Sequence, residues 1–173
     1  VGNLPLNGGA HDSDAVTGKV DSFTLPDVTF YFFDKGVACT DHSTTGGTQL
    51  NTLSPDGSGV AHPSTSETGL AAGTYNFMAV GAGNGNYTGK TGICEPFTVD
   101  KASLDISTTV HNDDGDVPLV GNLPLGGGAH DSASVTGKVN GFTLPDVTFY
   151  FFGKGVACTD HSTTGGTQLN TLS

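Results

Sequence analysis

The chain has 173 residues and a formal net charge of −11, with 27 glycines, no tryptophan and only 13% charged residues. The acidic balance argues against a nucleic-acid-binding protein, which needs a basic surface, and against adhesion to anionic lipid. No run of about 18 apolar residues is present, so the sequence predicts no membrane insertion.

Taken in chain order, the sequence predicts a series of short strands. Turn-forming Gly, Pro, Asn and Asp clusters separate strand-like stretches at 15–23, 28–33, 50–53, 59–64, 74–80, 92–99 and 104–111. This spacing, without any helical period, predicts an all-β fold, an antiparallel β-sandwich. The apolar positions predict a core that consists of Val28, Phe30, Phe32, Tyr75, Phe77, Ile93 and Phe97.

The first 54 residues return almost unchanged at the end of the sequence. Residues 120–173 repeat residues 1–54 with an offset of 119, and only six pairs differ: Asn7/Gly126, Asp14/Ala133, Ala15/Ser134, Asp21/Asn140, Ser22/Gly141 and Asp34/Gly153. Such repetition predicts a modular architecture. The best join follows the strand-like CEPFTV, so we expect a module at 1–101 that lacks its first strand or strands. Residues 102–173 would be the front part of the next module, completed by chain outside this sequence or by a neighbouring chain.

The strongest strand, VTFYFF at 28–33, is apolar on both faces. One face can supply the sandwich core, and a second apolar face indicates contact with another surface. We therefore expect Tyr31 and Phe33, with their repeats Tyr150 and Phe152, to form an assembly contact with an adjoining module.

The cysteine count follows the repeat. Cys39 and Cys158 occupy the same position in the two copies, and Cys94 lies in the part that occurs once. One pair per module predicts a Cys39–Cys94 disulfide, with Cys158 bonded to a cysteine outside this sequence; the alternative is free buried thiols. A closed loop of roughly 55 residues would contribute on the order of 4 kcal/mol.

Three motifs carry a family resemblance: Val28-Thr29-Phe30, Ala72-Gly73-Thr74-Tyr75 and Gly83-Asn84-Gly85-Asn86-Tyr87. With their spacing they resemble the bacterial immunoglobulin-like tandem repeats of secreted surface or filament proteins, over essentially the whole period. The resemblance implies an all-β fold of antiparallel immunoglobulin-like β-sandwich modules in tandem. It also implies an extracellular location and a spacer role in stalks, adhesins or fibres. The usual Gly-Asp of the turn is Gly83-Asn84 here, which removes one acidic ligand.

Two short motifs suggest chemistry. Asp113, Asp114 and Asp116 surround Gly115, an arrangement that could bind calcium or be a solvated turn. Asn86 begins a sequon that could be glycosylated or occur by chance.

The remaining polar motifs favour no catalysis. His11-Asp12-Ser13 is a sequence-adjacent trio, whereas a catalytic triad needs convergence in space and an oxyanion hole. The histidines show no zinc-ligand spacing. We expect no enzyme and no cofactor other than possible calcium.

These observations favour a structural repeat module of an extracellular filament or surface stalk, in which copies of itself are the partners. The alternative is an adhesin module that binds a glycan or host protein through exposed loops at 43–49 and 81–89, where repetition would provide avidity.

Overall fold

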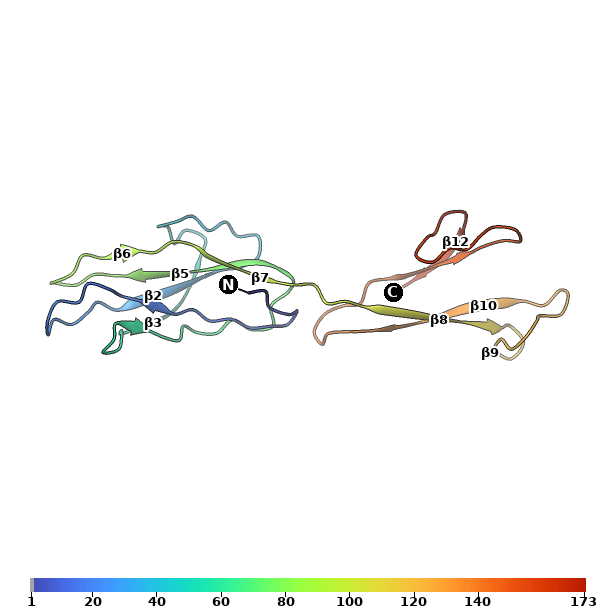
Figure 1. Cartoon of the computed structure of the whole chain (residues 1–173), viewed down its shortest axis with the longest axis horizontal. Coiled ribbons are helices and arrows are strands. Elements are labelled where there is room, and N and C mark those ends of the chain that lie inside the picture. Colours follow the sequence, from blue (N-terminus) through green and yellow to red (C-terminus); the bar gives the residue numbers. More distant parts are fainter. Residues whose placement is uncertain (1) are drawn as a thin grey trace. The chain divides into compact units, whose positions relative to one another are not determined.

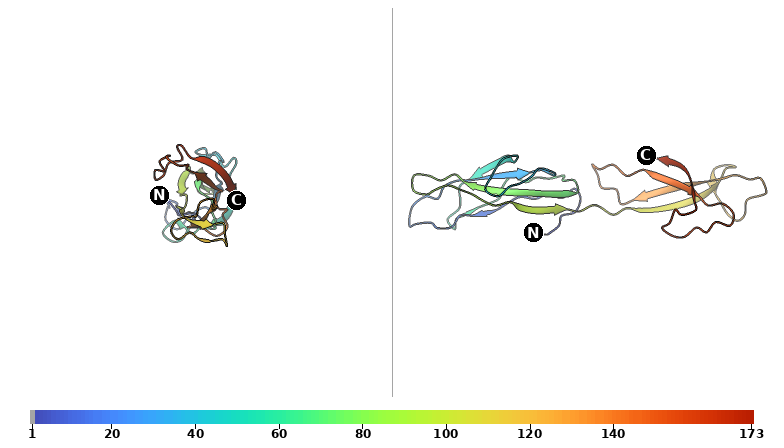
Figure 2. Two further views of the ribbon diagram at one scale, coloured as in Figure 1. Left: turned by 90° about the vertical axis from the view of Figure 1, so that its right-hand side faces the viewer. Right: turned by 90° about the horizontal axis from the view of Figure 1, so that it is seen from above.

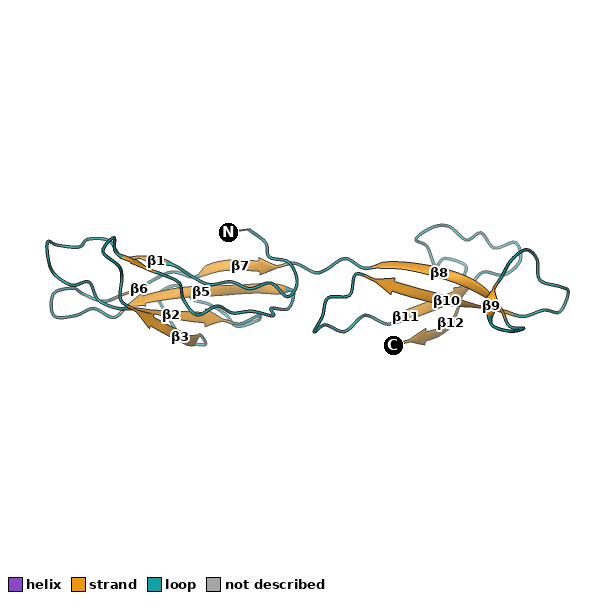
Figure 3. Ribbon diagram, turned by 90° about the horizontal axis from the view of Figure 1, so that it is seen from below, coloured by secondary structure: helices purple, strands orange, loops and turns teal. Residues whose placement is uncertain are grey.

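The computed structural model describes residues 2–173, which fold into two compact units divided between Ala102 and Ser103. Strands and loops make up both units, and residues 2–173 contain no helix (Figures 1 and 3). The strand pairs within the sheets are antiparallel, so the all-β antiparallel prediction is confirmed. Among these residues, no helix long and apolar enough to cross a membrane occurs. The break between the units falls next to the predicted join.

The first unit is built on a five-stranded sheet. Strand β2 (Val28–Phe33) lies between β3 (Thr48–Leu53) and β5 (Gly73–Gly81), and β5 also pairs with β6 (Lys90–Thr91) and β7 (Glu95–Val99). Strands β2 and β5 run side by side in Figure 2. A smaller pair, β1 (Asp14–Ala15) with β4 (Val60–Ala61), forms a second sheet.

The core lies on one face of the five-stranded sheet. Alternation along β2 directs Val28, Phe30 and Phe32 to this face, where all three side chains are buried. The neighbouring strands add Tyr75, Phe77, Phe97 and Val99. The rings of Phe32, Tyr75, Phe77 and Phe97 pack with centroids 5.3–5.7 Å apart. The predicted core is therefore correct except for Ile93, which is 56% exposed because β7 begins only at Glu95.

On the opposite face of β2, the chain's own loop at 34–47 covers Phe33. Phe33 is fully buried with its ring against Gly47, where an added Cβ would lie 2.8 Å from the ring. A disulfide joins Cys39 of this loop to Cys94, with a Cα–Cα distance of 6.0 Å. Two further contacts hold the loop to the same segment: Cys94 N–H donates to Asp41 Oδ1, and His42 N–H donates to the Gly92 carbonyl. The disulfide prediction is confirmed, and the loop it anchors explains why this strand is apolar on both faces.

The strand predicted over 15–23 is wrong for most of its length. Only Asp14–Ala15 forms a strand. Gly18 and Asp21 adopt positive φ values of 84° and 42°, which turn the chain out of the extended conformation. Leu25 still returns to the interior, where it is buried.

The second unit contains two separate sheets. Strand β8 (Asp105–Asn112) lies between β9 (Val117–Pro118) and β10 (Ala129–Thr136), and β11 (Val147–Phe151) pairs with β12 (Thr167–Leu172). Strands β11 and β12 repeat β2 and β3, but no strand equivalent to β5 lies beside them among the described residues. Phe151 is consequently 59% exposed, whereas its counterpart Phe32 is 6% exposed.

Candidate functional site

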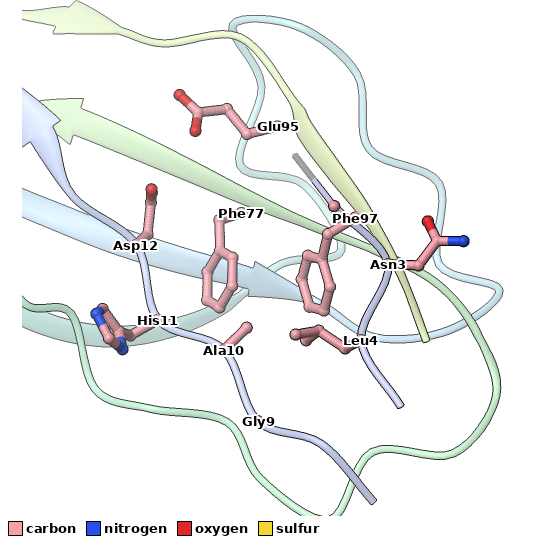
Figure 4. A pocket seen from close by; sticks show the side chains of 10 residues that line it. Asn3, Leu4, Gly9, Ala10, His11, Asp12, Phe77, Glu95 and Phe97 are labelled. Carbon is pink, nitrogen blue, oxygen red and sulfur yellow. The ribbon is translucent and has the colours of Figure 1, made fainter. Parts of the chain in front are cut away.

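An open groove of about 360 Å³ lies at the edge of the first unit (Figure 4). The N-terminal segment forms one wall with Leu4, Ala10 and Asp12, and the sheet forms the other with Phe77 and Phe97. Figure 4 shows the two phenylalanine rings side by side, with the segment of residues 9–12 running past them. Leu4 is held beside β7, since its N–H donates to the Thr98 carbonyl and its carbonyl accepts from Asp100 N–H. The groove therefore leaves part of the aromatic core next to solvent.

One edge of the segment 10–16 is already paired. Ala10 exchanges both backbone hydrogen bonds with Glu67, Asp12 accepts from Ser64 N–H, and Val16 donates to the Gly59 carbonyl. Successive residues of an extended strand direct their backbone groups to alternate edges. The backbone groups of His11 therefore face the other edge.

The second unit shows what pairs with that other edge. Residues 129–136 repeat residues 10–17 with two differences, and all eight pair with β8, from Ala129↔Asn112 to Thr136↔Asp105. Val110 of β8 lies with Ala129 and Asp131 in the lining of an apolar cavity. The counterparts of these two residues, Ala10 and Asp12, line the groove of the first unit. The groove thus lies where a strand equivalent to β8 would place its valine.

Asp12 gives the groove its electrostatic character. Its side chain is buried, and burial raises the pKa of the carboxyl to about 6, with smaller contributions from the charges of Glu95 and Asp14. The N–H of Ser13 donates to Asp12 Oδ1 at 2.7 Å, which opposes the rise. His11 does not join Asp12 and Ser13 in a triad; its ring lies 5.2 Å from that of His62.

The predicted assembly contact is wrong for Phe33. The loop at 34–47 buries this ring within its own unit, so the ring is not available to an adjoining module. Phe152 lies against Gly166 in the same way. Tyr31 is partly exposed and Tyr150 is 37% exposed, so a contact through the two tyrosines stays a prediction.

Two predicted modification positions are solvent-accessible. Asn86 is exposed in a turn where its N–H donates to Asn84 Oδ1, and glycosylation there stays a prediction. Cys158 is an exposed free thiol, and its bond to a cysteine outside this sequence stays a prediction.

The acidic turn between β8 and β9 forms a different cluster from the predicted calcium cage. Asp113 and Asp116 do not gather with Asp114 around one centre; their carboxylates contact the two ring nitrogens of His130 at 2.7 and 3.0 Å. Asp114 instead donates its N–H to Asn112 Oδ1. The hydrogen bond that Asp113 Oδ1 accepts from the His130 ring raises the pKa of the His130 imidazole, against the effect of desolvation.

His111 completes this cluster, and spacing along the sequence did not reveal it. Residues 111 and 130 are directly opposite in the β8–β10 pairing, and their rings stack with centroids 5.4 Å apart. The pair could have been predicted only from the register between β8 and β10, which the sequence analysis did not assign.

Comparison of the chain with protein-family models, with curated proteins and with solved structures gives no match.

Proposed function

We propose that this chain is part of an extracellular filament or surface stalk, built from tandem immunoglobulin-like modules that provide length and mechanical stability. Each module begins with a strand equivalent to β8, which fills the groove beside residues 10–16 and closes the sandwich. In a tandem array this strand comes from the same polypeptide, immediately before the module's 1–17 segment.

The free edge of residues 10–16 is the observation that carries the proposal. The near-identical segment 129–136 pairs with β8 along its whole length. The same residue types stand at the groove, because Ala10 and Asp12 repeat Ala129 and Asp131. A valine at the Val110 position would lie over Phe77 and Phe97, where burial of one valine side chain contributes about 1.5–3 kcal/mol.

Two further features suit a load-bearing array. Strand β7 ends at Val99 and β8 begins at Asp105, so a connection of five residues, 100–104, joins one module to the next. The disulfide closes 55 residues of the first unit and limits how far that unit can extend. In the complete array, Cys158 would bond to the cysteine that follows it at the Cys94 position.

A fusion tests the proposal directly. Residues 103–119 are placed ahead of Val1, which reproduces the order of the repeat, and thermal unfolding is compared with that of the original chain. We expect the first unit to melt at least about 5 °C higher, since about 1 kcal/mol shifts the melting temperature of such a domain by about 4–8 °C.

A matched fusion carries Asp at the Val110 position of the added segment. It should not raise the melting temperature of the first unit, because a charge cannot enter the apolar groove. Equal melting temperatures for all three proteins would contradict the proposal.

A further inference from the structure

The cluster on β8, β10 and the turn between β8 and β9 resembles a metal site more closely than a surface ion pair. His111 Nδ1 lies 3.3 Å from Asp116 Oδ1, and His130 Nε2 lies 3.0 Å from the same oxygen. The ligand atoms of these three residues all lie within 4.8 Å of one another. Two zinc ligands at about 2.0–2.1 Å from the metal in tetrahedral geometry are separated by about 3.3 Å. The two measured separations therefore fit the edges of a zinc tetrahedron.

The second nitrogen of each histidine is already held. His130 Nδ1 lies 2.7 Å from Asp113 Oδ1, and His111 Nε2 lies 3.0 Å from Ser132 Oγ. Histidine ligands of metals usually donate their other ring N–H to a carboxylate or another acceptor, which fixes the tautomer and the ring orientation. Asp113 and Ser132 supply these acceptors here. In that tautomer each imidazole presents one lone pair toward the Asp116 carboxylate; His111 Nδ1 also lies 3.4 Å from the Asp116 carbonyl oxygen.

We propose that His111 Nδ1, His130 Nε2 and the Asp116 carboxylate bind a divalent transition metal, with Zn²⁺ the best fit and water as a fourth ligand. Two nitrogen donors favour zinc, nickel or copper over calcium and magnesium, which take oxygen ligands. The metal would tie the turn between β8 and β9 to β10. This inference is independent of the proposed tandem function.

The repeat supplies a matched control. His11 is the counterpart of His130 and keeps the same neighbours in sequence, Ala10 and Asp12. Its ring faces His62 within the first unit, whereas Asp113 and Asp116 belong to the second unit. Replacement of His11 should therefore leave the metal site intact.

Isothermal titration of the full chain with ZnCl₂ tests the proposal. The Cys158→Ser background removes an exposed thiol that could bind zinc. We expect one equivalent of Zn²⁺, and a Kd at least tenfold weaker in His130→Ala or Asp116→Asn. In Asp113→Asn the affinity for Zn²⁺ should fall by about 10–100-fold. His11→Ala and Asp114→Asn should bind as the background does, and amide spectra would show which variants remain folded.

A Co²⁺ titration adds a spectroscopic measurement, because tetrahedral Co²⁺ absorbs visible light far more strongly than octahedral Co²⁺. The proposal would be overturned by the absence of saturable zinc binding, by calcium binding as tightly as zinc, or by equal losses in His11→Ala and His130→Ala. In the first case the cluster is an ion pair between His130 and two carboxylates only.

Discussion

The Cys39–Cys94 disulfide should set how far the first unit can be stretched. The bond closes a stretch of 55 residues and holds its ends with Cα atoms 6.0 Å apart. An extended chain spans at most about 3.6 Å per residue. Reduction should therefore add about 190 Å to the contour length that is released when the unit unfolds under force. The added length should come in the same event as unfolding.

Single-molecule pulling of the chain by its two ends, with and without reductant, measures this length. The Cys39→Ser, Cys94→Ser double variant should give the long extension in both conditions, and Cys158→Ser should behave as the original chain does. In denaturant, loss of the bond should cost about 4 kcal/mol of unfolding free energy, the chain-entropy value for a loop of this size. Equal contour lengths in oxidised and reduced protein would refute the reasoning.

Three further predictions concern stability. Asp12→Asn should stabilise the first unit by at most about 3 kcal/mol at pH 8. The pKa of Asp12 is raised from 3.8 to about 6 in the folded protein, so ionisation of this carboxyl opposes folding above about pH 4. Urea titrations should show this gain vanish near pH 3.5, and a gain independent of pH would contradict it. Asp56→Asn should instead lower the stability of the first unit at neutral pH. Hydrogen bonds from the N–H groups of Val60 and Ser58 lower the pKa of Asp56. The stability that the Asp56 carboxylate contributes is therefore present at neutral pH and is lost on acidification. Gly47→Ala should cost about 1–3 kcal/mol by forcing the buried Phe33 ring to move. The same change at the equivalent Gly166 should cost less, because Phe152 is only partly buried, and equal costs at the two positions would show that the ring is not confined.

The central strands could be predicted because β-branched and aromatic residues fill them and turn-forming residues bound them. Strand β2 has the predicted limits, and its Val28, Phe30 and Phe32 are buried together as expected. The paired cysteines were equally informative, since one cysteine per half-module leaves few partners. The predictions were wrong where the local backbone conformation overrides the alternation of apolar and polar residues. Ile93 keeps the alternation of β7 but precedes the strand, and it is exposed.

The covering loop and the histidine pair depend on contacts that local sequence does not encode. The apolar second face of β2 indicated a contact, but only the fold shows that residues 34–47 of the same unit make it for Phe33. His111 and His130 come together through an eight-residue register between β8 and β10. The acidic turn was recognised from sequence, but its histidine partners were not.

Hydrogen exchange at His11 tests the account most directly. The amides of Ala10 and Val16 are bonded within the first unit and should be protected in the chain as it stands. The His11 amide faces the open edge and should exchange rapidly there. With residues 103–119 fused ahead of Val1, we predict that the His11 amide becomes protected to the level of Ala10. Rapid exchange at His11 in the fused chain, with Ala10 still protected, would contradict the idea that a β8-type strand completes each module.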